Sequence, residues 1–297
     1  MALFIYCIVF PLLWLISLMP LRLLYVFSDI VLYPLIYYVA NYRKKVVYEN
    51  LRKSFPEKSE AEIAFIARKF YKHFGHILVE TIKLIHISHA EVKKRIRYRN
   101  PEVFFELFEK GKSIVAVTAH YGNWEWLVGT PENMPYRIIS LYKPLSNKYI
   151  EKIMTRMRTQ FGAELVTMEE APRVLFTYKQ NNVKTLSCFI SDQTPIRSRI
   201  HYQTQFLNQV TPVFLGPEKM ARKLNSAVVF VKMIPVKTGY YEFEIVPITE
   251  DASLTNEYEI TNKHVKILEE QIKEHPEFWL WTHRRWKYQI LDRDVQG

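Results

Sequence analysis

A histidine and a glutamate stand five positions apart in the segment Ala119-His120-Tyr121-Gly122-Asn123-Trp124-Glu125. The apolar run 113–118 before them is typical of a buried strand, and the residues after Gly122 resemble the opening of a helix. An imidazole at a strand end can meet a carboxylate in the next helix, as a general base meets the acid that orients it. The segment therefore predicts a catalytic pair, His120 and Glu125, and its alternative is a buried structural hydrogen bond.

Other catalytic signatures are weak or missing in this sequence. There is no G-x-S-x-G elbow for a serine nucleophile, and Cys188 lies in an apolar run that favours a place in the core. Two pairs of histidines are spaced three apart, at 73 and 76 and at 86 and 89, without the further ligands of a zincin pattern. We therefore expect neither a covalent nucleophile nor a metal.

Three further segments carry polar groups where a site could form. Lys143, in Tyr142-Lys143-Pro144, follows a predicted strand, so its cation could point into the same cleft or lie in a solvated turn. Asp192 and Gln193 end another predicted strand and would lie near His120 if the two strands are neighbours. The segment 279–286 mixes tryptophans with cations, which is typical of cation–π packing or of membrane-interface aromatics.

The elements that must position these residues form an alternating pattern. Such alternation predicts an α/β fold, with a mixed, mostly parallel sheet flanked by helices. Strands are expected near 113–118, 136–141, 164–167, 185–191, 227–234 and 240–248, and helices near 60–87, 102–110, 146–161, 169–180, 216–224 and 260–274. The basic run 93–99 fits an edge strand with outward charges, or a surface that docks an acidic partner.

Length, composition and charge limit the classes of protein that fit. The chain has 297 residues, 48% of them hydrophobic and only 8 of them glycine, which predicts a sizeable core and argues against a low-complexity protein. Its two cysteines, Cys7 and Cys188, are too few for a disulfide framework and fit a reducing compartment. The net charge of +11 suits anionic lipid, nucleic acid or an acidic protein, without choosing among them.

The first 42 residues predict a membrane anchor. The stretch 2–21 has no charged side chain and is about long enough to cross a bilayer. It lacks the basic start and the small-residue cleavage site of a signal peptide, which favours an uncleaved anchor. Residues 23–42 are interrupted by Asp29 and Pro34, which favours a helix in the membrane interface over a second span. The basic run 43–45 that follows favours the cytosolic side for the rest of the chain.

Taken together and in order, these segments resemble the late acyltransferases of lipid A biosynthesis, the lauroyl and myristoyl transferases. The family's His-x4-Asp/Glu motif is matched by His120 to Glu125, and the resemblance covers nearly the whole chain. Its other motifs are matched by Tyr142-Lys143-Pro144, Asp192-Gln193, Pro212-Val-Phe-Leu-Gly216 and Trp281-Thr-His-Arg-Arg285-Trp286. The chain departs from the family at Lys143, where arginine is usual, and after Gln193, where many members have a glycine-bearing segment.

The resemblance implies an inner-membrane enzyme with a glycerol-phosphate acyltransferase-like fold and a catalytic domain in the cytosol. Such an enzyme moves a fatty acyl chain from a thioester, usually on acyl carrier protein, to a hydroxyl of a lipid A precursor, and needs no cofactor. His120 would be the general base, and Glu125 would accept a hydrogen bond from the other ring nitrogen. Backbone amides after Gly122 would stabilise the oxyanion. Residues expected to contact substrate are Lys143, Asp192, Gln193, Arg284 and Arg285, the last two at anionic lipid. Lys143 would help to stabilise the oxyanion or bind a lipid phosphate, and Asp192 would contact the substrate or support a residue that does.

The expected division of the chain is a membrane anchor and interfacial segment at 1–42 and an acyltransferase domain at 43–297. Two alternatives to the lipid A function stay open at this stage. The same pair of residues could serve an acyltransferase for another membrane lipid, such as a phospholipid, an aminolipid or a glycolipid. The chain could also be a membrane-tethered module that binds anionic lipid or nucleic acid without catalysis. No nucleic-acid fold signature is present, so we expect no nucleic-acid partner.

Overall fold

A seven-stranded sheet forms the centre of the computed structural model, which describes residues 2–129 and 133–288. The end of the predicted domain, 289–297, lies outside the described residues. The strand order is β1-β9-β8-β2-β5-β3-β4, and neighbouring strands are parallel except for β8 and β9. The strands are β1 Ile96–Tyr98, β2 Ile114–Thr118, β3 Arg137–Tyr142, β4 Glu164–Thr167, β5 Thr185–Ile190, β8 Ala227–Lys237 and β9 Tyr240–Thr249. The predicted mixed, mostly parallel α/β sheet is therefore confirmed.

Strand β2 lies in the middle of the sheet because its sequence, Ile-Val-Ala-Val-Thr, is apolar on both faces. All five of its residues are buried, as expected for a strand that is covered by helices on either side. Val115 and Val117 belong to one core cluster, and Ile114 and Ala116 belong to the other. Alternate residues of β2 therefore connect the two halves of the core, and they fix the end of the strand from which His120 follows.

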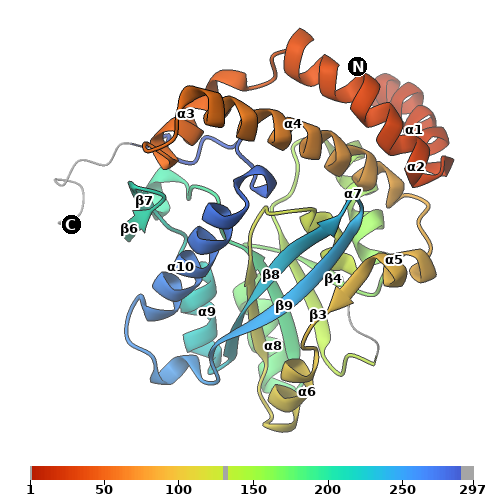
Figure 1. Cartoon of the computed structure of the whole chain (residues 1–297). Coiled ribbons are helices and arrows are strands. Elements are labelled where there is room, and N and C mark those ends of the chain that lie inside the picture. The colour runs from red at the N-terminus through yellow and green to blue at the C-terminus, as the bar shows by residue number, and fades with distance from the viewer. Residues whose placement is uncertain (1, 130–132, 289–297) are drawn as a thin grey trace.

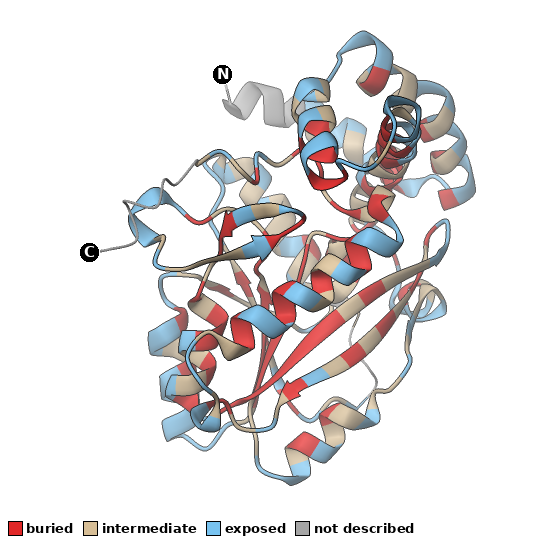
Figure 2. Cartoon of the chain, turned by 60° about the vertical axis from the view of Figure 1, so that its left-hand side comes forward, coloured by how far each residue is buried: buried red, intermediate tan, exposed pale blue. Residues whose placement is uncertain are grey.

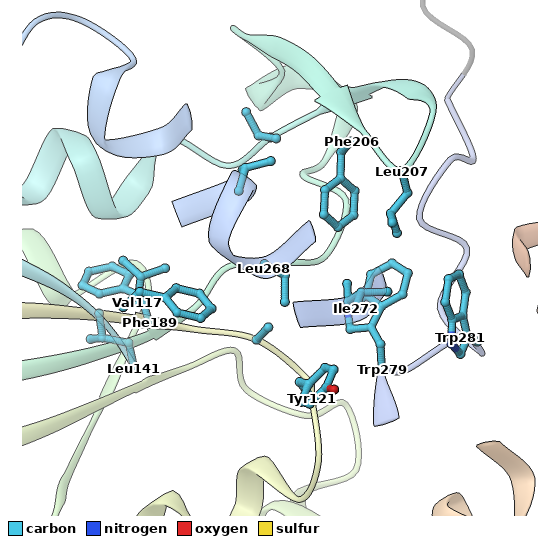
Figure 3. Packing of buried hydrophobic residues seen from close by; sticks show 14 of the residues in the cluster. Val117, Tyr121, Leu141, Phe189, Phe206, Leu207, Leu268, Ile272, Trp279 and Trp281 are labelled. Atoms are coloured by element: carbon cyan, nitrogen blue, oxygen red, sulfur yellow. The ribbon is translucent and has the colours of Figure 1, made fainter. Parts of the chain in front are cut away.

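Helices cover both sides of the sheet (Figure 1). The helices are α3 Lys44–Ser54, α4 Glu60–Lys83, α5 His89–Arg95, α6 Glu102–Glu109, α7 Lys148–Thr159, α8 Ala171–Gln180, α9 Gly216–Leu224 and α10 Glu259–Glu274. Figure 3 shows Val117 and Phe189 of the sheet facing the cluster that contains Leu268 and Ile272 of α10. The helices predicted from periodicity are all present, with ends that differ by a few residues.

Two local elements differ from the sequence-based expectation, and a third matches one of the interpretations of its sequence. The residues after Gly122 form only a five-residue 3₁₀-helix, η3 Trp124–Val128. The basic run 93–99 is shared between the end of α5 and β1, which lies at the sheet edge, as the edge-strand interpretation expected. A hairpin of β6 Gln203–Phe206 and β7 Gln209–Pro212 was not predicted, because these strands are short and polar. Its two turn residues, 207 and 208, both have positive φ, as a tight hairpin turn requires.

The N-terminal segment is helical and breaks near Pro20. Helix α1 Ala2–Leu18 ends before that proline, and α2 Leu21–Phe27 begins after it and continues through two π-helical turns to Val39. By length and composition, Leu21–Val39 is the described helix that could cross a membrane, whereas the sequence pointed to 2–21. Pro34 does not end this helix, and Asp29 pairs with Lys72 and His76 of α4, so the two interruptions are accommodated.

Exposed residues cover much of the N-terminal helices, while most residues of the central strands are buried (Figure 2). Many of the exposed residues on these helices are large and apolar. The most exposed of them are Leu12, Leu15, Leu23, Val26, Ile30, Tyr38 and Val39. Their inner sides pack against α4. A contiguous apolar surface of this kind is rare on a protein that contacts only water.

A buried carboxylate on α4 ties the N-terminal helices to the sheet and to the segment after His120. Glu80 is fully buried and accepts hydrogen bonds from Tyr25, Asn123 and Tyr241 at 2.8, 2.6 and 2.7 Å. Burial raises the pKa of Glu80, although these hydrogen bonds act to lower it. Asn123 in turn accepts a hydrogen bond from the amide of Glu125, so Glu80 supports the turn that carries the site.

Replacing Glu80 by alanine should lower the free energy of unfolding by about 2–4 kcal/mol, because three buried polar groups would lose their partner. The measurement is denaturant unfolding in detergent. Glu60→Ala is the control, because Glu60 is exposed in its ion pair with Arg52 and should matter little. Equal stability of the two variants would show that Glu80 does not hold these elements together.

Candidate active site

His120 follows the C-terminal end of β2 and is held there by backbone contacts. Its carbonyl accepts a hydrogen bond from the amide of Leu280, and Gly122 donates to the carbonyl of Phe278. Gly122 has a positive φ of 60°, and a Cβ there would lie 2.5 Å from Sδ of Met233, so only glycine fits this turn. The chain therefore turns sharply after the strand and leaves the imidazole at the C-terminal end of β2.

Asp192 follows β5, which is the parallel neighbour of β2, and it pairs with His120. Asp192 Oδ1 lies 2.7 Å from Nδ1 of His120, and Oδ2 accepts a hydrogen bond from Nε1 of Trp279 at 2.8 Å. In Figure 3, Trp279 lies close to Tyr121, the residue that follows His120. The parallel register of the two strands thus brings together residues that are 72 positions apart.

The Asp192 carboxylate is ionised despite its burial. Burial alone would raise its pKa, but the charge and hydrogen bonds of His120 and the hydrogen bond from Trp279 lower it to about 2. Because the Asp192 carboxylate accepts a hydrogen bond from Nδ1 of His120, the proton of the neutral imidazole is on Nδ1 and the lone pair is on Nε2. The Nε2 atom lies 3.3 Å from Nε2 of Gln193, so the side-chain amide of Gln193 can donate to it. His120 is therefore held in the tautomer that a general base needs.

The prediction of a hydrogen bond between His120 and Glu125 is wrong. Both ring nitrogens of His120 have other partners, and Glu125 is paired with Arg158 of α7 through two hydrogen bonds, at 2.9 and 2.6 Å. The reason is local geometry, because the short η3 turn directs Glu125 toward α7 instead of back toward the strand end. Burial acts to lower the pKa of Arg158, but the Glu125 carboxylate raises it above its ordinary value.

A pocket of about 460 Å³ is bordered both by His120 and by the Glu125–Arg158 pair. His120, Glu125, Arg158 and Lys143 line it together with many apolar side chains. The Trp124 indole also lines it, and packs edge to face on the imidazole with ring centroids 4.9 Å apart.

The pocket continues along the face of the sheet. Ile138, Ser140 and Tyr142 alternate on β3 and so line the pocket from one face of the strand. Cys188 of β5 lies beside Ser140 in the sheet register and lines it too. From Ile138 to Tyr142 the strand rises by about 13 Å. The pocket is therefore a largely apolar groove whose lining also includes the imidazole and the charged groups.

The structure separates the other predicted site residues into two groups. Lys143 is exposed at the pocket, and Gln193 contacts His120, so both lie where a substrate could meet them. Arg284 is exposed outside the pocket lining. Arg285 is only 2% exposed, and it lines a separate small cavity behind Asp192. The expectation that Arg285 contacts lipid is therefore corrected, since no lipid could reach a guanidinium that is enclosed by aromatic and aliphatic side chains.

Three of the amides at or after Gly122 already donate to protein acceptors and are therefore not free to bind an oxyanion. The Gly122 amide donates to Phe278, the Glu125 amide donates to the side chain of Asn123, and the Trp126 amide donates to the carbonyl of Asn123. The positive charge that does line the pocket is that of Arg158 and Lys143.

Arg158 and Trp279 were missed as site residues by reasoning from sequence. Arg158 lies beside buried Met157 on an amphipathic helix, and a cation at the margin of an apolar face is a weak signal of a buried partner. Trp279 lies in the aromatic segment near the C-terminus, for which packing was one of the interpretations weighed. Neither partner could be assigned without knowing that α7 and this segment close over β2 and β5.

Comparison with known proteins gives a consistent family. A profile of the bacterial lipid A biosynthesis acyltransferases matches residues 2–288. A lipid A biosynthesis palmitoleoyltransferase of Escherichia coli strain K12 is 23% identical over 247 residues, which cover 82% of this chain and 79% of that protein. A lipid A biosynthesis acyltransferase of Shigella flexneri is similar to the same extent. With a family match over nearly its whole length, the chain belongs to the bacterial lipid A biosynthesis acyltransferase family.

Proposed function

We propose that this protein transfers a fatty acyl chain from an acyl thioester to a hydroxyl of a lipid A precursor. The observation that carries the proposal is the His120–Asp192 pair, whose imidazole lines an apolar groove, in a chain of this family. A general base beside a space for a hydrocarbon chain is the arrangement that acyl transfer to an alcohol needs.

His120 removes the proton from the acceptor hydroxyl as its oxygen attacks the thioester carbonyl. The proton goes to Nε2, where the hydroxyl replaces the amide of Gln193, and Asp192 stabilises the imidazolium that results. The tetrahedral intermediate then collapses, the carbon–sulfur bond breaks, and the leaving thiolate takes the proton from the imidazolium. The products are an ester and a free thiol, and His120 is again neutral.

The mechanism needs no covalent acyl-enzyme. A thioester is already activated, and its thiolate is a good leaving group. Cys188 is the cysteine that lines the groove, but burial raises the pKa of its thiol to about 12, so it is not a thiolate at neutral pH. We therefore assign Cys188 to the wall of the groove.

Arg158 is the candidate for the group that stabilises the oxyanion. Its two hydrogen bonds to Glu125 hold the guanidinium in the pocket wall and keep it charged. A fixed cation in a site shielded from water stabilises developing negative charge more than a mobile one in water. In this proposal Glu125 acts through Arg158, which replaces the role first assigned to it beside His120.

Lys143 is proposed to bind a phosphate of the acceptor lipid. It is exposed, follows β3 and lines the pocket together with His120. A lysine provides a point charge without the planar two-pronged contact of arginine, so it suits an acceptor whose phosphate is bound loosely. The net charge of +11 fits both this lipid and an acidic acyl carrier protein as the donor.

The N-terminal helices are proposed to bring the enzyme to its lipid substrate. Residues 1–42 would form the membrane-binding part of the chain and 43–297 the acyltransferase domain. The exposed apolar surface and the helix Leu21–Val39 support this division. We further propose that the catalytic domain faces the cytosol of a bacterium, at its inner membrane, because the basic run 43–45 follows the apolar segment directly.

The groove predicts that a mutation in its wall can shift the preferred length of the acyl chain. Ser140→Leu places a larger side chain on the β3 face that lines the groove, next to Cys188. We expect transfer of the longest chain that the wild type accepts to fall by roughly 10–100-fold, while shorter chains are used as before. The measurement is a competition between acyl thioesters of different length.

Ser146→Leu is the matched control, because Ser146 is exposed and does not line this groove. An unchanged chain-length preference in Ser140→Leu would show that the acyl chain lies elsewhere.

The acceptor is tested by the lipids of a strain that lacks this protein. If the acceptor is a lipid A precursor, its lipid A should lack one secondary acyl chain, and the full-length gene should restore it. Unchanged lipid A together with a lost acyl group on a phospholipid, aminolipid or glycolipid would replace this acceptor by that lipid.

A further inference from the structure

A second, much smaller cavity lies behind Asp192, on the side away from the groove. It has a volume of about 10 Å³ and is lined by Ser191, Asp192, His264 and Arg285, with apolar side chains around them. Ser191 also lines the large pocket, so one residue separates the two spaces. The cavity is therefore the next layer of structure behind the His120–Asp192 pair.

Four polar atoms of the residues that line this cavity are buried without a hydrogen-bond partner among the described residues. They are Oγ of Ser191, Nε2 of His264, and Nε and Nη1 of Arg285. Such atoms are rare in folded proteins, and each one costs free energy when it stays unpaired. Three residues from different segments bring such atoms to one cavity. This arrangement indicates a ligand that forms hydrogen bonds with them.

The size and charge of the cavity identify the ligand as water. A space of about 10 Å³ is near the minimum for one water molecule, which typically makes two to four hydrogen bonds. The charge of Arg285 is already opposed by Asp192, which lines the same cavity, so no anion is needed for neutrality. His264 is neutral at pH 7, because burial lowers its pKa to about 4. One water can accept from Arg285 and donate to Ser191 or His264.

Arg285 itself is an unusual group to find in this place. It is 2% exposed, and among the described residues no carboxylate forms an ion pair with its guanidinium, which lies 5.9 Å from the ring centroid of Phe206. Burial lowers its pKa to about 10, so it still carries a positive charge at neutral pH. A buried cation is costly unless another group uses its charge, and the carboxylate of Asp192 is the anion of its cavity.

We propose that this cavity holds an ordered water molecule that joins Arg285 to Ser191 and His264. The water keeps the guanidinium at the cavity that Asp192 also lines, so Arg285 is a positioning residue for the Asp192–His120 pair. The inference rests on the proposed function, because it assigns a role within the same reaction. The charges of Arg285 and Asp192 attract each other, and the positive charge of Arg285 limits how firmly the pair holds the proton taken from the acceptor. The imidazolium then gives that proton up readily to the leaving thiolate.

Other charged groups near the pair do not supply the same effect. Arg158 lies on the groove side, where its ion pair with Glu125 offsets part of its charge at the distance of Asp192. His283, from the same C-terminal segment as Arg285, is neutral at pH 7 because burial lowers its pKa to about 4, and it accepts a hydrogen bond from the Thr194 amide. His264 of α10 is likewise neutral, and Lys287 is exposed to water, so Arg285 is the buried charge that faces Asp192.

The test compares Arg285→Met with Arg285→Lys. Methionine keeps the length of the side chain without its charge, whereas lysine keeps the charge. A nearby positive charge opposes protonation of the pair, so in Arg285→Met the acidic limb of the pH–activity profile should move to higher pH by about one unit. On that limb, turnover at a fixed pH should fall by up to about 10-fold, because one pH unit is a factor of ten in the fraction of deprotonated base. Arg285→Lys should keep the position of the limb even if it is less active.

A role in folding alone predicts a different result, namely less active protein and an unshifted profile. A superimposed acidic limb in Arg285→Met and wild type would overturn the positioning role. Should Arg285→Met fail to fold, Ser191→Ala provides the milder variant, which removes one partner of the water and should lower turnover without moving the limb. A shifted limb in Ser191→Ala would contradict the assignment of the effect to the charge of Arg285.

The water is tested separately by a high-resolution crystal structure of the wild-type protein in detergent. The expected result is a solvent peak within hydrogen-bond distance of Arg285 and Ser191. An empty cavity, or a chloride ion in it, would overturn the proposal. This measurement needs no activity, so it distinguishes failure of the water site from failure of the proposed acyl transfer.

Discussion

Replacing His120 by alanine should lower the rate of acyl transfer by roughly 10²–10⁴-fold while the fold is kept. The imidazole is the group that can take the proton of the acceptor, and its Nε2 atom faces the side-chain amide of Gln193 at the pocket. The variant would keep the apolar groove, the group that stabilises the oxyanion and the lipid-binding residues. Its residual rate therefore measures what these features contribute. The measurement is initial rate under saturating donor and acceptor.

His201→Ala is the matched control, because His201 is exposed and lies outside the groove lining. It should transfer acyl groups at the wild-type rate. A folded His120→Ala protein with unchanged activity would end the general-base mechanism.

Asp192→Asn should lower turnover by a factor of the same order, roughly 10²–10⁴-fold. The amide keeps the shape of the side chain but loses the charge that fixes the tautomer of His120 and stabilises the imidazolium. Without that anion the pair is harder to protonate, so the acidic limb of the pH–activity profile should move to lower pH. The direction is opposite to that expected for Arg285→Met, because the two residues carry opposite charges.

Asp192 also links stability to pH. Because its pKa in the folded protein is lowered from 3.8 to about 2, it stabilises the fold above pH 3.8, and this contribution is lost as the pH falls toward 2. Asp251→Asn is the matched control, since the pKa of Asp251 is also lowered to about 2, chiefly by its hydrogen bond from Lys112, away from the site. If both variants kept wild-type activity, Asp192 would have no part in the reaction.

The sheet could be predicted from the sequence because its strands are apolar and its helices amphipathic. Strand β2 is an uninterrupted apolar run, and β4 was expected at the four residues where it lies. Strands β6 and β7 were not, because their stability depends on the contacts of Phe206 with the tryptophans of the C-terminal segment and not on local pattern.

The position of His120 could be predicted, but its partner could not. Proximity in the chain favoured Glu125, which stands five residues away. The actual partner, Asp192, is adjacent only because β5 pairs with β2 in a parallel register, and this pairing is a property of the whole sheet. Asp192 and Gln193 were expected at a strand end near His120, but Asp192 was not expected to be the hydrogen-bond partner of its imidazole. Arg158 reaches Glu125 only because α7 packs beside η3.

The N-terminal segment shows a similar limit. Its apolar character is evident from composition, but the place of the helix break is set by Pro20. Asp29 interrupts the pattern in sequence, whereas in the structure its charge is matched by Lys72 and His76 of α4. Tertiary partners thus make Leu21–Val39 the longer of the two apolar helices.

The central claim is that His120, oriented by Asp192, catalyses transfer of an acyl chain to a lipid hydroxyl. The most direct measurement gives the purified protein a set of acyl thioesters and an under-acylated lipid A precursor, and follows the mass of the lipid. The account predicts that the wild-type protein adds one acyl chain and that His120→Ala and Asp192→Asn add it at a small fraction of that rate. Transfer by both variants at the wild-type rate, or no transfer to this acceptor by the wild type with any thioester, would contradict it.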